Sequence, residues 1–392
     1  MRLASRAGWG LIALALALVA VYFLTPSNHP LTPKASLSIA TALRASNEQG
    51  YARAIAPREF RFPADHGPHP EFRTEWWYYT GNLETAEGRR FGFQLTFFRS
   101  ALAPEMPVRE SAWATRQAWL AHFTVSDVDG GRFHSFERWS RGAVGLAGAR
   151  AEPFRVWVKD WRAEAVGSPS EDPTPPMHLA AAEGDVGIDL VLQPGKPPVL
   201  QGDRGLSRKS AEVGNASYYY SLTRMPAAGT IHLGGERFAV TGLAWMDREW
   251  STSSLGRDQV GWDWFALQLS DGSDLMLYRL RRQDGAADPA SSGTVVVPTG
   301  DARHLRLADF QIAPSGEWRS PRSGGRYPGQ WRVRIPAEEL DLEVRPLLAD
   351  QELDVSFRYW EGAVEVAGNR RGRPVRGRGY VELTGYTTAG HR

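Results

Sequence analysis

Apolar and polar residues alternate with a period of two through most of the chain after residue 60, as in β-strands with one buried face. In the segment 91–99, Phe and Leu occupy the odd positions up to residue 97, whereas Gln94 and Thr96 lie on the opposite face. The same pattern predicts further strands at 74–80, 119–125, 154–158, 188–192, 218–222, 238–244, 262–269, 275–280, 331–335, 340–344, 355–359, 363–366 and 379–383.

Short turns rich in glycine separate these strands, as at 129–131, 234–235 and 271–272. Such spacing predicts antiparallel meanders that close into sandwiches or barrels. A dozen or more strands exceed one eight-stranded barrel, so the sequence predicts two consecutive all-β units. We place their junction near 245–250 and expect long surface loops at 286–300 and 315–329, which are rich in Gly, Ser and Pro.

The N-terminus has a different pattern. Arg2 and Arg6 precede an apolar run over residues 7–24, which is about long enough to span a bilayer. Residues 1–24 are therefore predicted to be a signal peptide or an uncleaved membrane anchor, and the protein to be exported: periplasmic, membrane-anchored or secreted. Residues 25–57 are predicted to form a tether with a short helix over 35–49.

Composition narrows the function classes. The chain of 392 residues is 42% hydrophobic and 23% charged, which is typical of globular proteins. Its formal net charge is +2, and Arg2 and Arg6 account for that excess, so nucleic acid is not expected as a partner. The chain has no cysteine, which rules out thiol catalysis, disulfides and thiolate metal sites.

Six of the 15 tryptophans lie in three short strings that also carry acids, at 74–82, 242–250 and 261–265. Acids among indoles line a cavity or need buried partners. Strand alternation places Trp76 on one face of the first string and Glu75, Trp77 and Tyr79 on the other. A buried Glu75 would have a raised pKa and could act as a general acid; the alternative is that it pairs with an arginine such as Arg99.

In the second string Asp247 and Glu249 share a face, roughly 6.5–7 Å apart if the strand persists. That separation lies near the lower edge for inverting glycosidases, although Asp-Arg-Glu is equally a salt-bridge triplet. Asp263 lies on an apolar face and needs a partner there, and His122 on its strand is interpreted as a ligand contact or a hydrogen-bonded core residue. His66 and His69 could approach a zinc ion, but the segment 65–75 is better interpreted as a surface or rim loop.

The strings at 62–66, 74–81, 245–250 and 261–265 resemble the carotenoid 1,2-hydratase family of lipocalin-like proteins, which includes the AttH-like and predicted secreted hydrolase groups. The similarity extends from about residue 60 to 386. It implies two consecutive lipocalin-like antiparallel β-barrels without a cofactor, which we place at 58–248 and 249–390, after the N-terminal apolar helix.

The resemblance also implies a chemistry. Hydratases of this family add water to a terminal alkene: an acid protonates the alkene, aromatic faces stabilise the carbocation and water captures it. Asp247, Trp250 and Tyr278 match the hydratase pattern. Arg248 stands where the hydratases have histidine, and Leu280 stands where they have aspartate.

We therefore expect a protein that binds a lipophilic small molecule in an aromatic cavity. One hypothesis is an enzyme that carries out acid-catalysed hydration, or related cation or cyclisation chemistry, on an apolar alkene. The alternatives are a non-catalytic lipophile carrier, an accessory partner of a membrane transporter, or, on spacing alone, a glycan hydrolase. Candidate catalytic acids are Glu75, Asp247 and Glu249. Candidate ligand-binding residues are Trp76, Trp77, Tyr79, Arg99, His122, Arg248, Trp250, Trp262, Asp263, Gln268 and Tyr278. No metal or other cofactor is expected.

Overall fold

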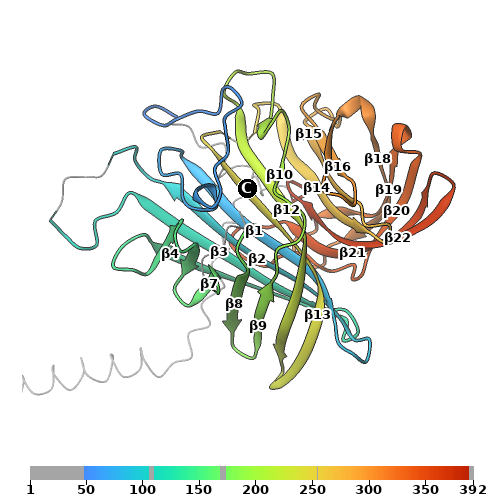
Figure 1. Cartoon of the computed structure of the whole chain (residues 1–392), viewed down its shortest axis with the longest axis horizontal. Helices are drawn as coiled ribbons and strands as arrows, with labels where there is room; N and C mark the ends of the chain where they lie inside the picture. Colours follow the sequence, from blue (N-terminus) through green and yellow to red (C-terminus); the bar gives the residue numbers. More distant parts are fainter. Residues whose placement is uncertain (1–47, 106–109, 168–173, 254, 388–392) are drawn as a thin grey trace, which may run out of the picture. The chain divides into compact units, whose positions relative to one another are not determined.

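The computed structural model describes residues 48–105, 110–167, 174–253 and 255–387. Within these ranges the chain is all-β and forms two curled antiparallel sheets (Figure 1). The predicted signal or anchor segment at 1–24 and most of the tether, with its helix, lie outside the described residues. None of the helices inside the described ranges has the length and apolar character needed to cross a membrane.

The first sheet contains β1 to β13, in the order β4-β3-β2-β1-β13-β12-β9-β8-β7-β6-β5, with β10 and β11 also paired to β12. Its strands are β1 Thr74–Glu84, β2 Arg90–Ala101, β3 Gln117–Asp127, β4 Arg132–Arg141, β5 Ala147–Arg150, β6 Arg155–Val158, β7 Trp161–Ala165, β8 Met177–Glu183, β9 Val186–Leu192, β10 Val199–Leu200, β11 Leu206–Arg208, β12 Ala216–Leu233 and β13 Glu236–Ser251.

The second sheet contains β14 to β22, in the order β17-β16-β15-β14-β22-β21-β20-β19-β18. Its strands are β14 Gln259–Leu269, β15 Asp274–Arg282, β16 Ser292–Val296, β17 Ala302–Arg306, β18 Gln311–Arg319, β19 Arg326–Ile335, β20 Leu340–Pro346, β21 Trp360–Arg370 and β22 Arg373–Leu383. Three short 3-10 helices accompany the sheets: η1 Ala64–His66, η2 Leu307–Asp309 and η3 Pro336–Glu338.

Both sheets share one topological feature. The first strand of each sheet pairs with its last strand, β1 with β13 and β14 with β22. The two edge strands of each sheet follow each other in the sequence but do not pair: β4 and β5 in the first sheet, β17 and β18 in the second. The first sheet ends at Ser251, so the predicted boundary between residues 248 and 249 falls inside β13.

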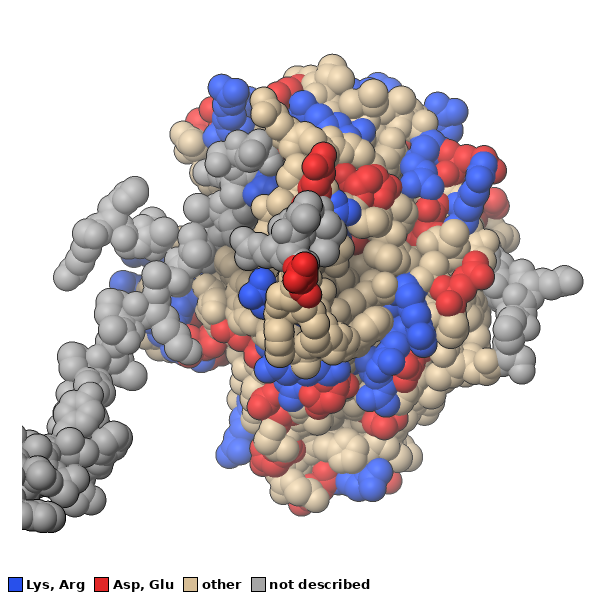
Figure 2. All heavy atoms as spheres, turned by 90° about the vertical axis from the view of Figure 1, so that its left-hand side faces the viewer, with Lys and Arg blue, Asp and Glu red and all other residues tan. Residues whose placement is uncertain are grey.

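On the surface in Figure 2, acidic and basic side chains lie close to one another.

Side chains alternate along β1 between the core of the first sheet and the face that packs against the second sheet. Trp77 and Tyr79 point inward and belong to the main core, together with Phe93, Phe97 and Trp161. Trp76 and Tyr78, on the opposite face, point toward the second sheet instead. Apolar side chains thus form most of the described core inside the first sheet.

The second sheet has a core of its own around Phe265, Trp331 and Trp360. A separate apolar cluster lies between the two sheets and contains Tyr78 from the first sheet and Trp264 from the second. Hydrogen bonds also cross this junction: Tyr78 donates to Glu361, and the amide of Asn82 donates to a backbone oxygen of β22 at 2.9 Å. The sheets therefore pack face to face through specific contacts.

Three sequence predictions are wrong. Residues 355–359 form no strand, although Val355 and Tyr359 are buried. The stretches 286–300 and 315–329 are not simple surface loops, because β16, β18 and the start of β19 run through them. The loop after residue 64 is not a surface or rim loop, because Asp65, His66 and His69 are buried. In each case tertiary pairing or packing outweighed the local composition.

A buried charge network lies inside the first sheet at its β1–β13 pair. Glu75 accepts hydrogen bonds from both Arg99 and Arg248, and the two arginines and the acid are at most 1% exposed. The guanidinium of Arg248 lies 3.9 Å from the ring centroid of Trp77. Burial alone would raise the pKa of Glu75, but the charges of Arg248 and Arg99 outweigh it and hold this pKa well below its usual value.

We predict that Glu75→Gln destabilises the protein by about 3–5 kcal/mol, because two buried arginines lose their counter-charge. Urea unfolding at pH 7, followed by circular dichroism, measures the change in midpoint. The matched control is Glu343→Gln, which removes an exposed partner of Arg345 and should cost less than about 1 kcal/mol. Equal losses in the two variants would contradict the role assigned to the network.

Candidate functional site: an aromatic cavity between the two sheets

One row of side chains crosses six neighbouring strands on the outer face of the first sheet. Because β1 to β4, β12 and β13 pair in register, residues directly opposite one another point to the same side. The row consists of Trp139, Leu120, Phe98, Trp76, Glu249 and Tyr219. All of them line a cavity between the two sheets.

The second sheet supplies the opposite wall. Trp262 and Trp264 of β14 face the cavity together with Tyr278 and Leu280 of β15, and Glu382 of β22 joins them. Other residues that line it are Leu255, Phe357 and Tyr359. The cavity has a volume of about 170 Å³, and most of its lining is aromatic or aliphatic. These properties suit an apolar small molecule.

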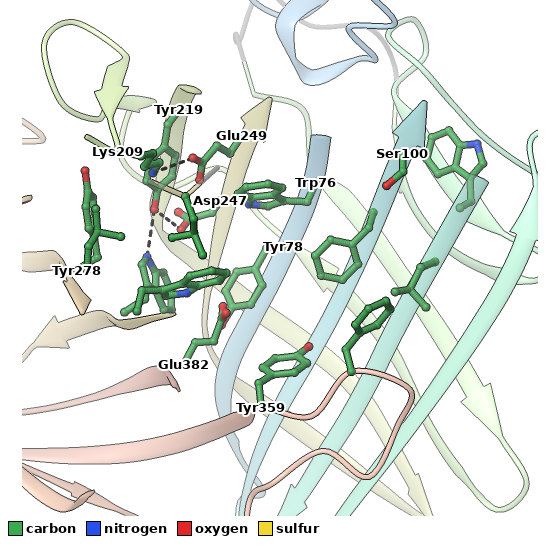
Figure 3. Close-up of a pocket in the computed structure, with 18 of the residues that line it drawn as sticks. Trp76, Tyr78, Ser100, Lys209, Tyr219, Asp247, Glu249, Tyr278, Tyr359 and Glu382 are labelled. Carbon is green, nitrogen blue, oxygen red and sulfur yellow. Dashed lines mark hydrogen bonds and ion pairs between the residues drawn. The ribbon is translucent and has the colours of Figure 1, made fainter. Parts of the chain in front are cut away.

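Asp247 is a buried acid at this cavity, 4% exposed. Ser221 and the indole of Trp245 donate hydrogen bonds to its Oδ1 at 2.6 and 2.7 Å, and Tyr219 donates to its Oδ2 (Figure 3). Burial raises the pKa of Asp247 to about 7, against the lowering effect of these hydrogen bonds. Asp247 therefore exchanges a proton near neutral pH, as a general acid or base must.

Glu249, two residues further along β13, has a different environment. Its Oε1 lies 2.8 Å from Nζ of Lys209, and it accepts a hydrogen bond from Ser217. The ammonium of Lys209 lies 4.7 Å from the ring centroid of Tyr278. Burial alone would lower the pKa of Lys209, but Glu249 outweighs it and raises this pKa. Glu249 and Lys209 thus form an ion pair at the wall of the cavity.

Glu382 faces the same space from the second sheet, near Tyr78 and Tyr359 in Figure 3. Burial raises the pKa of Glu382 to about 8, and the negative charges of Asp247 and Glu249 add to the effect of burial. Behind it, burial and the charge of Glu382 hold the pKa of Glu361 well above its usual value. The cavity therefore contains a carboxyl group that is mostly protonated at neutral pH.

The structure brings five of the sequence-predicted residues to the cavity: Trp76, Asp247, Glu249, Trp262 and Tyr278. Six others face the inside of the first sheet and do not line the cavity: Glu75, Trp77, Tyr79, Arg99, Arg248 and Trp250. Glu75 lacks the raised pKa expected of a general acid, because its two arginines stabilise the carboxylate. The inward and outward faces of β1 and β13 account for this division.

The remaining three predicted residues have partners within the protein. His122 is buried beside the cavity wall and its Nδ1 lies 2.8 Å from the hydroxyl of Tyr359; burial lowers the pKa of His122 to about 3. Asp263 accepts a hydrogen bond from Arg281 at 2.9 Å. Gln268 donates to two backbone oxygens of the first sheet and so ties the sheets together.

In the described part of the chain, no three His, Cys, Asp or Glu side chains are grouped so that they could hold a metal ion.

A family model for AttH-like proteins matches residues 53–386, which include both sheets and the whole cavity. The chain belongs to the AttH-like family. A comparison with functionally curated proteins found no match.

The solved structures that resemble this AttH-like protein over most of its length include the following two. One is described as an AttH from Nitrosomonas europaea: it is 36% identical, with a TM-score of 0.75, over 86% of this chain and 100% of that one. The other is kievitone hydratase from Nectria haematococca, at 16% identity and a TM-score of 0.64, over 86% of this chain and 96% of that one. At that identity the second likeness shows the fold alone.

Sequence reasoning missed Tyr78, Lys209, Tyr219, Trp264 and Glu382 as cavity residues of this AttH-like protein. Tyr78 and Trp264 could have been found, because they alternate with Trp76 and Trp262 on predicted strands. Glu382 also lies on a predicted strand, but only the pairing of β22 with β14 brings it opposite Trp264. Lys209 lies just beyond the short β11, and no pattern in the neighbouring sequence indicates that it lines a cavity.

We predict that Asp247→Asn combined with Glu382→Gln stabilises the protein at alkaline pH. Both acids have folded-state pKa values above their unfolded values, so the native protein loses stability as pH rises through about 7 to 8. The variant should gain on the order of 2–4 kcal/mol at pH 8.5 and nothing near pH 4.

Urea midpoints across this pH range test that prediction. The Asn side chain can keep the contacts of Asp247, because the hydroxyl of Tyr219 can turn to accept from the new amide. The control is Asp341→Asn, since Asp341 is a surface acid whose pKa is lowered by Arg332. A gain of equal size at pH 4 and pH 8.5 would exclude linkage to these two protons.

Proposed function

We propose that this AttH-like protein binds a lipophilic small molecule between two lipocalin-like barrels and transfers a proton to it, as the first step of adding water to a carbon–carbon double bond. The observation that carries the proposal is the placement of Asp247 and Glu382, with pKa values of about 7 and 8, in a cavity walled by indole and phenol rings. Each acid can hold a proton at neutral pH and still face an apolar ligand.

The proposed reaction balances without a cofactor. The carboxyl group of Glu382 gives its proton to one alkene carbon, and the other carbon becomes a carbocation. The faces of Trp76, Trp262 and Trp264 stabilise this positive charge. A water molecule then attacks the cation, and the proton it releases passes to a carboxylate, so the net change is the addition of one water molecule.

The two departures from the hydratase pattern fit this assignment. Arg248 does not face the cavity, since it is committed to Glu75 inside the first sheet. Leu280 does face it, and Glu382 lines the same wall, so we propose that Glu382 supplies the acid that hydratases carry at the Leu280 position. The likeness to kievitone hydratase supports the fold of such an enzyme and leaves the substrate open.

A second candidate is a non-catalytic carrier of lipophiles or an accessory partner of a membrane transporter. It is favoured by the Lys209–Glu249 ion pair, which neutralises one cavity acid without any ligand.

In either case we propose that the protein is exported and that residues 1–24 direct it to the membrane. A glycan hydrolase is not proposed, because the cavity is mostly apolar.

We predict that Trp262→Ala weakens binding of the uncharged fluorescent hydrophobe N-phenyl-1-naphthylamine by about tenfold, because one indole wall of the cavity is lost. A fluorescence titration measures the dissociation constant. The matched control is Trp318→Ala, since Trp318 is also partly buried but lies on β18, away from the cavity. Equal affinities for the two variants would show that the probe binds elsewhere.

We predict that Glu382→Gln and Asp247→Asn each lower alkene hydration by about 100-fold or more while the naphthylamine probe still binds. Lycopene and squalene in detergent, incubated in ¹⁸O-labelled water, serve as trial substrates, and mass spectrometry detects the added label. Wild-type activity should fall as pH rises through about 8, because the acid form of Glu382 is then lost.

The control for that experiment is Glu343→Gln on the surface of β20. Full activity in both cavity variants would refute the acid assignment. Probe binding without turnover of either alkene by the wild type would favour the carrier over the enzyme.

A further inference from the structure

The exposed large hydrophobic side chains are unevenly distributed. Among the described residues there are seven: Ile55, Leu102, Trp113, Trp139, Val144, Leu146 and Val213. All belong to segments that meet one end of the first sheet, namely the lead into β1, the β2–β3, β4–β5 and β11–β12 connections, and the last residues of β4. We call this set the apolar rim.

Contacts at that end of the sheet join these segments. The amide of Leu102 donates to the carbonyl of Arg116 at 2.7 Å, and the amide of Gly142 donates to the carbonyl of Gln117 at 3.1 Å. A Cβ added to Gly214 would lie 2.6 Å from Nε of Arg53, so the β11–β12 connection touches the lead into β1. The rim is therefore one region assembled from four separate segments.

The mouth of the cavity opens at the same end. Ser100 and Trp139 both line the cavity and are exposed, and Trp139 is 47% exposed. Trp139 is thus a member of the rim and of the cavity wall at once. Figure 2 looks onto this end, where uncharged side chains lie among charged ones.

The described chain also begins at this end. Gly50 packs against Pro104 of the β2–β3 connection so closely that an added Cβ would lie 2.9 Å from the proline Cβ. The described chain, from residue 48, therefore begins beside the rim. The 47 residues that precede it in the sequence include the apolar run at 7–24.

We propose that the apolar rim inserts into the surface of a lipid bilayer, so that a lipophilic molecule passes between the bilayer and the cavity without crossing water. The proposal rests on the proposed binding of a lipophile. Isolated Trp, Leu, Val and Ile side chains around an opening suit a fluid lipid surface, and Trp is favoured at the boundary between headgroups and acyl chains.

Single-cysteine labelling of the full-length chain tests this orientation directly. Because the protein has no cysteine, Leu102→Cys or Leu146→Cys introduces a unique site for the environment-sensitive dye NBD. The matched control is Glu236→Cys, an exposed position at the β12–β13 turn, at the other end of those strands. Each labelled protein is reconstituted in phosphatidylcholine vesicles with and without brominated lipid.

The rim labels should shift their emission to the blue and be quenched by brominated lipid, whereas the control label should stay aqueous. Equal signals from rim and control positions would overturn the proposal. Rim labels that remain aqueous but transfer energy to labels on other copies would instead identify the rim as a protein interface.

A second variant separates loading from binding. Leu102→Glu combined with Leu146→Glu puts charges on the rim without touching a cavity residue. Transfer of the naphthylamine probe from vesicles to the protein should slow by about tenfold or more, while its affinity in detergent stays unchanged. An unchanged transfer rate would contradict the loading route. Failure of the wild-type protein to bind the probe would overturn the proposed function. The labelling experiment would still show whether the rim contacts lipid.

Discussion

The arrangement of this protein depends on the in-register pairing of β1 with β13. Thr74 to Glu84 pair with Ser251 to Thr241 without a bulge, so each strand presents one continuous face inward and one outward. A slip of one residue would exchange those faces and bring Glu75 to the cavity. The buried bonds from Glu75 to Arg99 and Arg248 oppose such a slip, because they form only when all three side chains point inward.

This pairing also creates two opposite electrostatic environments on one strand pair. Inward, arginines hold the pKa of Glu75 low, and the network is structural. Outward, no arginine lines the described cavity, and burial raises the pKa of Asp247 and Glu382 into the physiological range. Nearby acids on β1 and β13 thus differ in chemistry because of the side of the sheet to which they point.

The sequence was sufficient for the all-β class, for most strands and for the resemblance to the AttH-like family. The sequence also predicted correctly that Trp76 and Glu75 lie on opposite faces of their strand, as do Asp247 and Arg248. This was possible because the alternation of side chains along a strand is a local property. It could not say which face was inward, because that depends on how the sheets curl. Glu382 and Tyr359 lie more than 100 residues from Asp247 in the chain, so only the packing of the second sheet brings them to the site.

The shared topology of the two sheets has a consequence for how the chain acquires its structure. Thr74 and Ser251 are hydrogen-bonded neighbours separated by 177 positions, so the β1–β13 pair cannot form until nearly two thirds of the polypeptide has been synthesised. Contacts of such long sequence separation make folding slow. The first sheet of a nascent chain of this kind therefore closes late, only after its last strand has been synthesised.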